Sequence, residues 1–354
     1  MKKYIVVLIG IMFLASCGKK EEAQTQKQAT ASNVELLGAG ATFPYPFYSK
    51  MFDEYYKINN IKVNYQAIGS GGGIRQMFDK TVDFGASDAF MSDQELSQAG
   101  ATIVHFPMCL GAVCITYNLP GNPKLKLTGE LIADIFSGKI KKWNDKRISS
   151  INPGVNLPSV NMTVVHRSDG SGTTFIFSDF LTKVSPEWAK NIGTGKSLNW
   201  PAGLGGKGNP GVAGLVKQTP GAVGYVELIY SKSNNMPVAD VQNKSGNFIE
   251  PTIESTSLSA NVVLPPDTRV SLTNTDAAQG YPISSFTWVI LYKELNYKGK
   301  SLDQAKQIVN LVHWMFTKGQ KYAEPLFYAP LPQAAVDRND ANLKTITYNG
   351  KPIL

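Results

Sequence analysis

At residues 167–174 the chain reads Arg-Ser-Asp-Gly-Ser-Gly-Thr-Thr, which sets one fixed cation beside a dense group of small hydrogen-bond donors. The apolar residues between Phe175 and Leu181 recur at mixed spacings of three and four, and they predict the first turns of a helix. Residues 170–173 would then present backbone N–H groups at the helix N-terminus, which attracts an anion. Arg167 could donate two parallel hydrogen bonds to the same anion. Taken alone, the stretch is more often an ordinary N-capped helix after a loop.

Two other glycine-rich loops stand between a strand-like run and a helical pattern. Residues 38–44 (Gly-Ala-Gly-Ala-Thr-Phe-Pro) precede a stretch in which Phe47, Met51, Phe52 and Tyr55 share one face. Residues 68–74 (Ile-Gly-Ser-Gly-Gly-Gly-Ile) follow the strand-like residues 61–65 and open a helix that runs through Phe78. Each loop is weak support by itself, because glycine loops before helices recur throughout α/β proteins. Three in one chain predict a single anion enclosed by several helix N-termini.

Short apolar runs alternate with amphipathic stretches in the rest of the chain, which is the pattern of α/β sheets. The runs are residues 104–106, 113–117, 162–165 and 288–292. The clearest helix spans Ser301 to Phe316, where Ser301 and Gln304 predict a capping box. Its apolar face consists of Ala305, Ile308, Val309, Val312, Met315 and Phe316.

Six segments resemble the signatures of a known family, the periplasmic phosphate-binding proteins of the phosphate-specific ABC-type uptake system. They lie in the family's order across almost all of the chain after residue 33, and their combination is highly specific. The segments are Gly38–Pro44, Ile68–Gly72, Asp83–Asp88, Arg167–Thr173, Gly203–Gly208 and Pro220–Tyr225.

The resemblance implies an α/β chain with the two-lobed, type II periplasmic-binding-protein fold. Each lobe would be a central β-sheet flanked by helices, with the ligand in the cleft between the lobes. Lobe I would be discontinuous, with residues 33–116 and 287–354, and lobe II would comprise residues 117–286. The function that follows is capture of inorganic phosphate and its delivery to an ABC-type import permease, without catalysis and without a cofactor.

The resemblance also implies a set of phosphate ligands. These are Thr42, Phe43 through its backbone N–H, Ser70, Asp88, Arg167, Ser171, Gly172 and Thr173. Asp169 would sit behind Arg167, where it would hold and partly neutralise the guanidinium. The family often has a second serine at Gly71, so this chain has one hydroxyl fewer in that loop. Neutral hydroxyls and helix-terminal amides suit a buried dianion, because they supply donors without a cluster of excess positive charge.

Asp88 is the unusual member of this set. A carboxylate that faces an anion is unfavourable unless the anion has a proton to donate, and phosphate at neutral pH has one whereas sulfate has none. Asp88 would therefore favour phosphate over sulfate. The alternative is a helix N-cap before the stretch Met91 to Leu96, a role that Ser87 or Ser92 could serve equally well.

The N-terminus is typical of a bacterial lipoprotein. Lys2 and Lys3 precede an apolar run from Tyr4 to Leu14, which is too short to span a membrane and suits a signal-peptide core. Residues 1–16 would be removed, and Cys17 would become the lipid-modified N-terminus. Residues 17–32 predict a flexible tether, because residues 18–32 lack apolar periodicity. These features predict an extracytoplasmic protein anchored to a bacterial membrane, in the periplasm or at the cell surface.

The composition agrees with a binding protein and disfavours several other classes. With 354 residues, 43% apolar and 18% charged, the chain can form one large or two medium domains. The formal charge of +8 is dispersed rather than striped, which disfavours nucleic acid as a partner and can modestly speed anion capture. The tight cluster Lys139–Lys142 is interpreted as a solvated edge. Three histidines without metal-ligand spacing predict no metal site, and we expect a monomer.

Cys109 and Cys114 lie in one apolar run, where an extended strand would hold their Cα atoms about 16 Å apart, too far for a disulfide. A turn at Gly111 could bring them together. Buried reduced cysteines are the preferred interpretation, although the compartment would permit a bridge.

Three other functions remain open from the residues. The chain could bind another tetrahedral oxyanion, such as arsenate or sulfate. It could be a secreted phosphoester hydrolase with Ser171 as nucleophile, although His166, the nearest candidate base, should point to the opposite face of its strand. It could be a purely structural surface lipoprotein, which the converging glycine loops disfavour. The segments Gly195–Ser197 and Gly203–Gly208 imitate a P-loop and a dinucleotide motif only formally.

Overall fold

The computed structural model describes residues 35–354. The predicted signal peptide at residues 1–16, the predicted tether at residues 17–32 and Cys17 therefore lie outside the described residues. Strands and helices alternate along the described part, as expected for an α/β chain.

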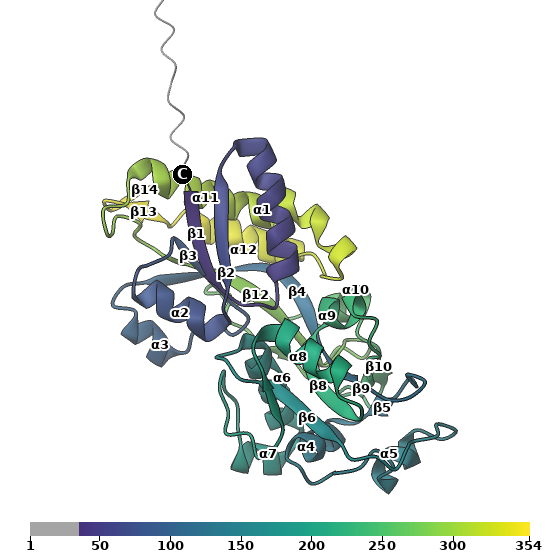
Figure 1. Ribbon diagram of the computed structural model, residues 1–354. Coiled ribbons are helices and arrows are strands. Elements are labelled where there is room, and N and C mark those ends of the chain that lie inside the picture. Colours follow the sequence, from purple (N-terminus) through teal and green to yellow (C-terminus); the bar gives the residue numbers. More distant parts are fainter. Residues whose placement is uncertain (1–34) are drawn as a thin grey trace, which may run out of the picture. The chain divides into compact units, whose positions relative to one another are not determined.

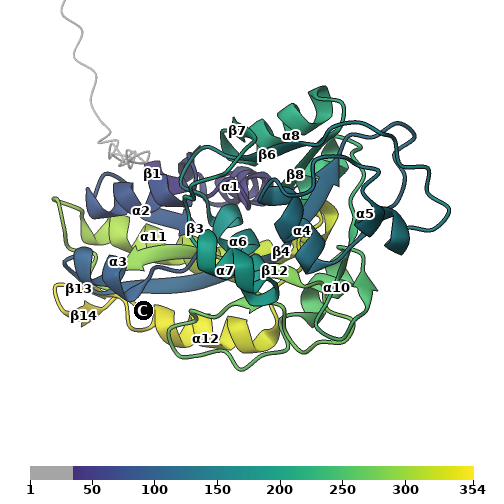
Figure 2. The ribbon, with the colours of Figure 1, turned by 90° about the horizontal axis from the view of Figure 1, so that it is seen from below.

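A mixed sheet runs through this part of the chain (Figures 1 and 2). Its strands are β1 (Glu35–Gly40), β2 (Lys62–Ala67), β3 (Phe84–Ser87), β4 (Ile103–Tyr117), β6 (Thr163–Arg167), β7 (Leu204–Gly206), β8 (Ala222–Glu227), β11 (Leu272–Thr273) and β12 (Ile283–Tyr292). Their order is β2-β1-β3-β12-β4-β8-β6-β7, and β11 pairs with β12. Two smaller sheets contain β5 (Lys126–Leu127), β9 (Asp240–Gln242) and β10 (Phe248–Ile249), and β13 (Thr347–Tyr348) and β14 (Lys351–Pro352).

Helices cover both halves of the sheet (Figure 1). Around the half that contains β1 lie α1 (Tyr45–Asn59), α2 (Ser70–Phe78), α3 (Asp93–Gln98), α11 (Leu302–Phe316), η1 (Lys318–Tyr322), η2 (Glu324–Leu326) and α12 (Gln333–Leu343). With the other half lie α4 (Gly129–Phe136), α5 (Lys146–Ile151), α6 (Gly172–Val184), α7 (Pro186–Asn191), α8 (Gly208–Gln218), α9 (Leu228–Ser233) and α10 (Ile253–Leu258).

The long strand β4 belongs to both halves of the sheet. Residues 103–112 pair with β12, whereas residues 113–117 pair with β8, so the partner changes after Ala112. The runs 104–106 and 113–117, which the sequence predicts as separate strands, are parts of this one strand, because the residues between them are buried and paired as well. The lobe boundaries implied at 116/117 and 286/287 stay a prediction.

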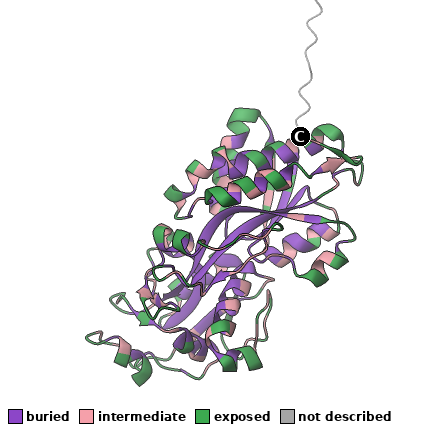
Figure 3. Ribbon diagram, turned by 180° about the vertical axis from the view of Figure 1, so that it is seen from behind, coloured by how far each residue is buried: buried purple, intermediate pink, exposed green. Residues whose placement is uncertain are grey.

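The sheet forms the core of the described part, with the outer faces of the helices exposed (Figure 3). Every residue of β8 and β12 is buried. Cys109 and Cys114 are buried and not bonded to each other, as the sequence favours, because β4 continues through Gly111 without a turn.

The three glycine loops begin helices as predicted. They join β1 to α1, β2 to α2, and β6 to α6. Gly69, the N-cap of α2, has a positive φ of 87°, a conformation that strains other residues. Each loop therefore turns a strand end directly into a helix N-terminus.

The apolar face predicted for α11 is buried, but the predicted capping box is only half formed. Ser301 Oγ accepts a hydrogen bond from the Gln304 N–H at 3.1 Å. The Gln304 side chain donates instead to Asp83 Oδ1 at 3.0 Å. The prediction of the reciprocal bond from Gln304 to the Ser301 backbone is therefore wrong. A buried carboxylate is a stronger acceptor for that amide, and Asp83 ties α11 to the start of β3.

Candidate functional site

Two helix N-termini meet at the hydroxyl of Ser70. Ser70 is the first residue of α2 and Gly172 is the first residue of α6. Ser70 Oγ accepts hydrogen bonds from the Gly172 N–H at 3.1 Å and from the Asp88 N–H at 3.2 Å. Donors from distant parts of the chain thus converge on one buried acceptor atom. The positive ends of two helix dipoles point at the same place, which favours negative charge there.

Arg167 ends β6 and lies next to this point, with a side chain only 1% exposed. Its Nε and Nη2 donate to the two carboxylate oxygens of Asp169 at 2.7 and 2.6 Å. Nη1 donates to Thr173 Oγ1 at 3.2 Å. The fork that the sequence offers to an anion is therefore shared with Asp169. Although burial raises the pKa of Asp169, the hydrogen bonds and charge of Arg167 hold it below the usual value.

Thr42 and Thr173 are linked through Asn209, a residue that the sequence analysis missed. Asn209 donates to Thr42 Oγ1 through its backbone N–H at 3.0 Å and through Nδ2 at 3.1 Å. Nδ2 also donates to Thr173 Oγ1 at 3.0 Å. Asn209 is the second residue of α8 and follows Gly203–Gly208 directly. That glycine motif was the available signal, because it marks the start of another helix at the site.

Phe43 lies in the loop before α1, and Ser171 lies directly before α6. Phe43 is fully buried, and its carbonyl accepts a hydrogen bond from the Tyr328 hydroxyl at 2.6 Å. Ser171 is the N-cap of α6, and its Oγ accepts from the Thr174 N–H at 3.0 Å. The Tyr328 hydroxyl thus fixes the Phe43 carbonyl, and the Ser171 hydroxyl caps α6.

Asp88 follows β3 and is buried at the same point. Burial raises the pKa of its carboxyl to about 7, while hydrogen bonds from Thr287 and Ser70 and the charge of Arg167 oppose this shift. The Thr287 hydroxyl, which the sequence analysis also missed, donates to Asp88 Oδ1 at 2.8 Å. No spacing in the sequence connects these two residues.

The helix-cap alternative for Asp88 is wrong. Helix α3 starts at Asp93, five residues after Asp88, and its N-cap is Ser92. Ser92 and Glu95 form a complete capping box there. Asp88 thus serves no cap on α3.

The hydrolase alternative lacks a base at Ser171. The His166 ring stacks on Trp200 with ring centroids 4.7 Å apart, and its Nδ1 lies 3.0 Å from the carbonyl oxygen of Arg167. Among the described residues, no group of three or more His, Cys, Asp or Glu side chains could hold a metal ion.

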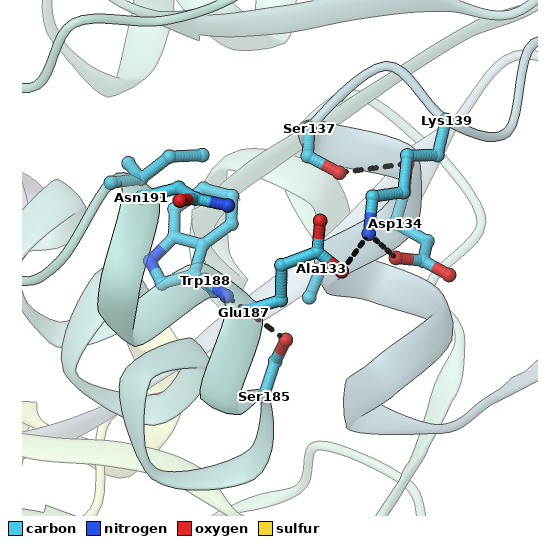
Figure 4. A pocket seen from close by; sticks show the side chains of 9 residues that line it. Ala133, Asp134, Ser137, Lys139, Ser185, Glu187, Trp188 and Asn191 are labelled. Atoms are coloured by element: carbon cyan, nitrogen blue, oxygen red, sulfur yellow. Dashed lines mark hydrogen bonds and ion pairs between the residues drawn. The ribbon is translucent and has the colours of Figure 1, made fainter.

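A pocket between α4 and α7 lies in another part of the fold (Figure 4). Its charged groups are paired with one another, since Lys139 Nζ contacts Asp134 Oδ1 at 3.3 Å and also contacts Glu187. Its volume is about 30 Å³, which is the space of roughly one water molecule. We assign no ligand to it.

Sequence comparisons connect the chain to phosphate-binding proteins. Residues 20–318 match the family model of the PBP superfamily domain. The phosphate-binding protein PstS of Xylella fastidiosa strain 9a5c is 44% identical over 316 residues, which cover 87% of this chain and 85% of that protein. PstS of Pasteurella multocida strain Pm70 is 43% identical and covers 88% of this chain and 90% of its own length.

A solved structure gives the fold. The high-affinity periplasmic phosphate-binding protein PfluDING, bound with phosphate, superposes with a TM-score of 0.68 at 21% identity and covers 87% of this chain and 93% of that one. The chain therefore has the two-lobed α/β fold of the periplasmic binding proteins. Within residues 35–354, no helix has both the length and the apolar character needed to cross a membrane.

Proposed function

Because the chain belongs to the PBP superfamily, and within it to the family of the PstS phosphate-binding proteins, we propose that it captures inorganic phosphate and delivers it to an ABC-type import permease. It acts as a solute-binding protein and catalyses no reaction. Phosphate binds between the two lobes, whose boundaries we place at 116/117 and 286/287.

The observation that carries this proposal is the convergence at Ser70. The N–H groups of Gly172 and Asp88 both reach one oxygen atom, next to the buried guanidinium of Arg167. A phosphate oxygen accepts the same kind of hydrogen bonds as that hydroxyl oxygen. The ligands in the proposal are Thr42, the Phe43 N–H, Ser70, Asp88, Arg167, Ser171, Gly172 and Thr173, with Asp169 behind Arg167.

Asp88 supports phosphate as the anion. Its carboxylate is an acceptor in a shell of donors, and it can bind the proton that phosphate retains at neutral pH. Sulfate would offer it nothing and would add repulsion between like charges. An arsenate that keeps a proton would be accepted on the same chemistry.

Outside the described residues, we propose that cleavage before Cys17 yields an extracytoplasmic lipoprotein attached to a bacterial membrane. The short apolar run after Lys2 and Lys3 supports this, as does the polar segment that follows Cys17. Incorporation of labelled palmitate into the mature chain tests the anchor. The protein would act as a monomer, which sedimentation tests.

Isothermal titration of the purified mature chain with phosphate and with sulfate tests the function. We expect stoichiometric phosphate binding and much weaker sulfate binding at the same pH and ionic strength. Absence of phosphate binding, or equal affinity for both anions, would overturn the proposal. Turnover of a chromogenic phosphate ester would favour the hydrolase instead.

A further inference from the structure

The Asp88 carboxyl has two oxygen atoms in different surroundings. Oδ1 accepts the hydrogen bond from Thr287 Oγ1 at 2.8 Å, whereas Oδ2 lies 3.4 Å from Ser70 Oγ. All three side chains are buried. Oδ2 therefore faces the point where the N-termini of α2 and α6 meet, and Oδ1 faces the sheet.

Thr287 holds Oδ1 from a rigid position. It lies in β12, which pairs with β3 so that Trp288 is opposite Ser87, the residue before Asp88. Thr287 is also paired with Cys109 of β4. Since β12 has neighbours on both sides and every one of its residues is buried, the sheet holds the Thr287 backbone beside the Asp88 carboxyl.

We propose that Thr287 is a positioning residue for anion selectivity: its hydroxyl anchors Asp88 Oδ1, so that the carboxyl stays an acceptor and presents only Oδ2 to the ligand. This inference rests on the proposed function, because it names the group that makes the phosphate site discriminate. A carboxylate that presents Oδ2 as an acceptor suits an anion that donates a proton. A carboxyl that gained a proton could donate to any oxyanion, sulfate included.

The protonation state of Asp88 makes this anchor important. Burial raises the pKa of Asp88 to about 7, and the bond from Thr287 is first among the interactions that lower it. Loss of the Thr287 hydroxyl should therefore leave more of the carboxyl protonated near neutral pH. The other titratable groups that interact with Asp88 come from several neighbouring elements and are unchanged by the substitution: Tyr48, Tyr65, Cys109, Arg167, Asp169, Glu227, Tyr230 and Tyr328.

Thr287→Val removes the donor and keeps the shape of the side chain. The measurement is the ratio of phosphate affinity to sulfate affinity by titration calorimetry of the full mature chain, from about pH 6 to about pH 8, on either side of the pKa. We expect the ratio at neutral pH to fall roughly tenfold, since a hydrogen bond to a charged group has about this worth. Sulfate affinity should rise while phosphate affinity falls. The pH at which discrimination weakens should move upward.

Thr287→Ser keeps the hydroxyl and should retain the ratio and the pH profile of the unmodified protein. Ser285→Ala is the matched control, because Ser285 lies two residues earlier in β12 and, within the described part of the chain, no hydrogen bond joins it to Asp88. If Thr287→Val melts at a much lower temperature, Thr287→Ala and the carboxyl ¹³C titration of Asp88 provide the same test. In that titration, both Thr287→Val and Thr287→Ala should show a higher pKa of Asp88 than the unmodified protein.

The outcomes separate the two proposals. If the unmodified protein binds neither anion, or both equally, the proposed function fails. If the unmodified protein prefers phosphate but Thr287→Val changes neither the ratio nor its pH profile, the positioning role of Thr287 is wrong while the proposed function stands. An equal loss of affinity for both anions would likewise contradict it, since that result indicates structural damage only.

Discussion

Arg167 is a buried cation that binds an anionic side chain, Asp169, in the candidate site. Its guanidinium is almost completely buried and binds both oxygens of Asp169, and its Nη1 reaches Thr173 beside the start of α6. Removal of the cation would leave the Asp169 carboxylate without its partner, which costs more than the lost hydrogen bonds alone. The residue is thus important both for binding and for the stability of the loop.

Arg167→Ala should lower phosphate affinity by about 3 kcal/mol or more, which is at least about 100-fold in Kd. Arg167→Lys should recover only part of this loss, because an ammonium keeps the charge but cannot bind both Asp169 oxygens in the same planar geometry. Titration calorimetry measures both variants. Arg75→Ala is the control, since Arg75 is an exposed cation in the last turn of α2. Unchanged affinity in Arg167→Ala would show that this loop does not bind phosphate.

Asp88 should also make stability depend on pH. Burial raises its pKa to about 7 in the folded protein, whereas an aspartate in the unfolded chain titrates near about 3.9. Because the folded value is higher, the stability that Asp88 contributes is complete below about pH 4 and is lost as the pH rises through about 7.

The variant Asp88→Asn has no titrating group at this position. Between about pH 4 and about pH 8, its free energy of unfolding should therefore fall by up to about 4 kcal/mol less than that of the unmodified protein. Urea unfolding in phosphate-free buffer measures this difference. Burial also raises the pKa of Glu227 well above its usual range, so both proteins should keep a residual slope of the same sign. Equal slopes in the two proteins would mean that Asp88 is solvated without ligand.

Local sequence signals predicted the glycine loop of Ser171 and Gly172 before a helical pattern. Asp88 was predicted as a ligand only by the resemblance to the phosphate-binding family. Thr287 carries no such signal, and Asn209 is marked only by the glycine motif before it, because their roles depend on bonds to Asp88 and Thr42, which are 199 and 167 residues away in the chain. Only the folded sheet brings these residues together.

The helices α2 and α6 approach each other more closely than side chains usually allow. A Cβ atom on Gly172 would lie 2.5 Å from Ser70 Oγ, at the start of α2, and 2.7 Å from Asp88 Cβ, in the segment after β3. The close approach of the two helix starts therefore depends on glycine at this position. The sequence predicted that these helices begin at glycine loops, but the distance between them follows from how β2 and β6, the strands that lead into them, are placed in the sheet.

Gly172→Ala should lower phosphate affinity by about fivefold to about 100-fold, because overpacking costs about 1–3 kcal/mol and the added methyl pushes α6 away from Asp88. The melting temperature without phosphate should fall as well, because the same overpacking destabilises the folded protein. Gly214→Ala, within α8, is the matched control, since a Cβ there meets nothing within 4 Å and should only stabilise the helix. Full phosphate affinity in Gly172→Ala would contradict the close approach of α2 and α6.

The two halves of the sheet are joined by contacts that no sequence pattern shows. The Gly71 N–H donates to the Gly170 carbonyl at 2.9 Å, and Lys196 pairs with Glu95 at 2.7 Å. In each pair, one residue lies before the proposed boundary at residues 116/117 and the other lies after it. Resemblance predicted two lobes, and periodicity predicted some of the strands and helices. The continuity of β4 through both halves was missed, because short apolar runs do not reveal which strand pairs with which.

The ion pair between Lys196 and Glu95 should slow the release of phosphate. It is only partly exposed, and it connects α3 to the loop whose Lys196 carbonyl accepts from the Ser171 N–H at 2.8 Å. Lys196→Met removes the charge and keeps most of the apolar stem, and Glu95 retains its capping bonds to Ser92. We therefore expect faster dissociation with little loss of stability.

The expected increase in the phosphate dissociation rate is about twofold to about fivefold, because an ion pair near the surface contributes about 0.2–1 kcal/mol. High salt should reduce the difference, since it screens the pair in the unmodified protein. Stopped-flow release measured at low and high salt provides the test. Lys244→Met is the control, because Lys244 pairs with Asp276 at the surface and both residues lie within the proposed lobe II. If both variants release phosphate equally fast, the Lys196 pair does not hold the halves together, and phosphate release must depend on other contacts, such as those at Ser70 and Gly172.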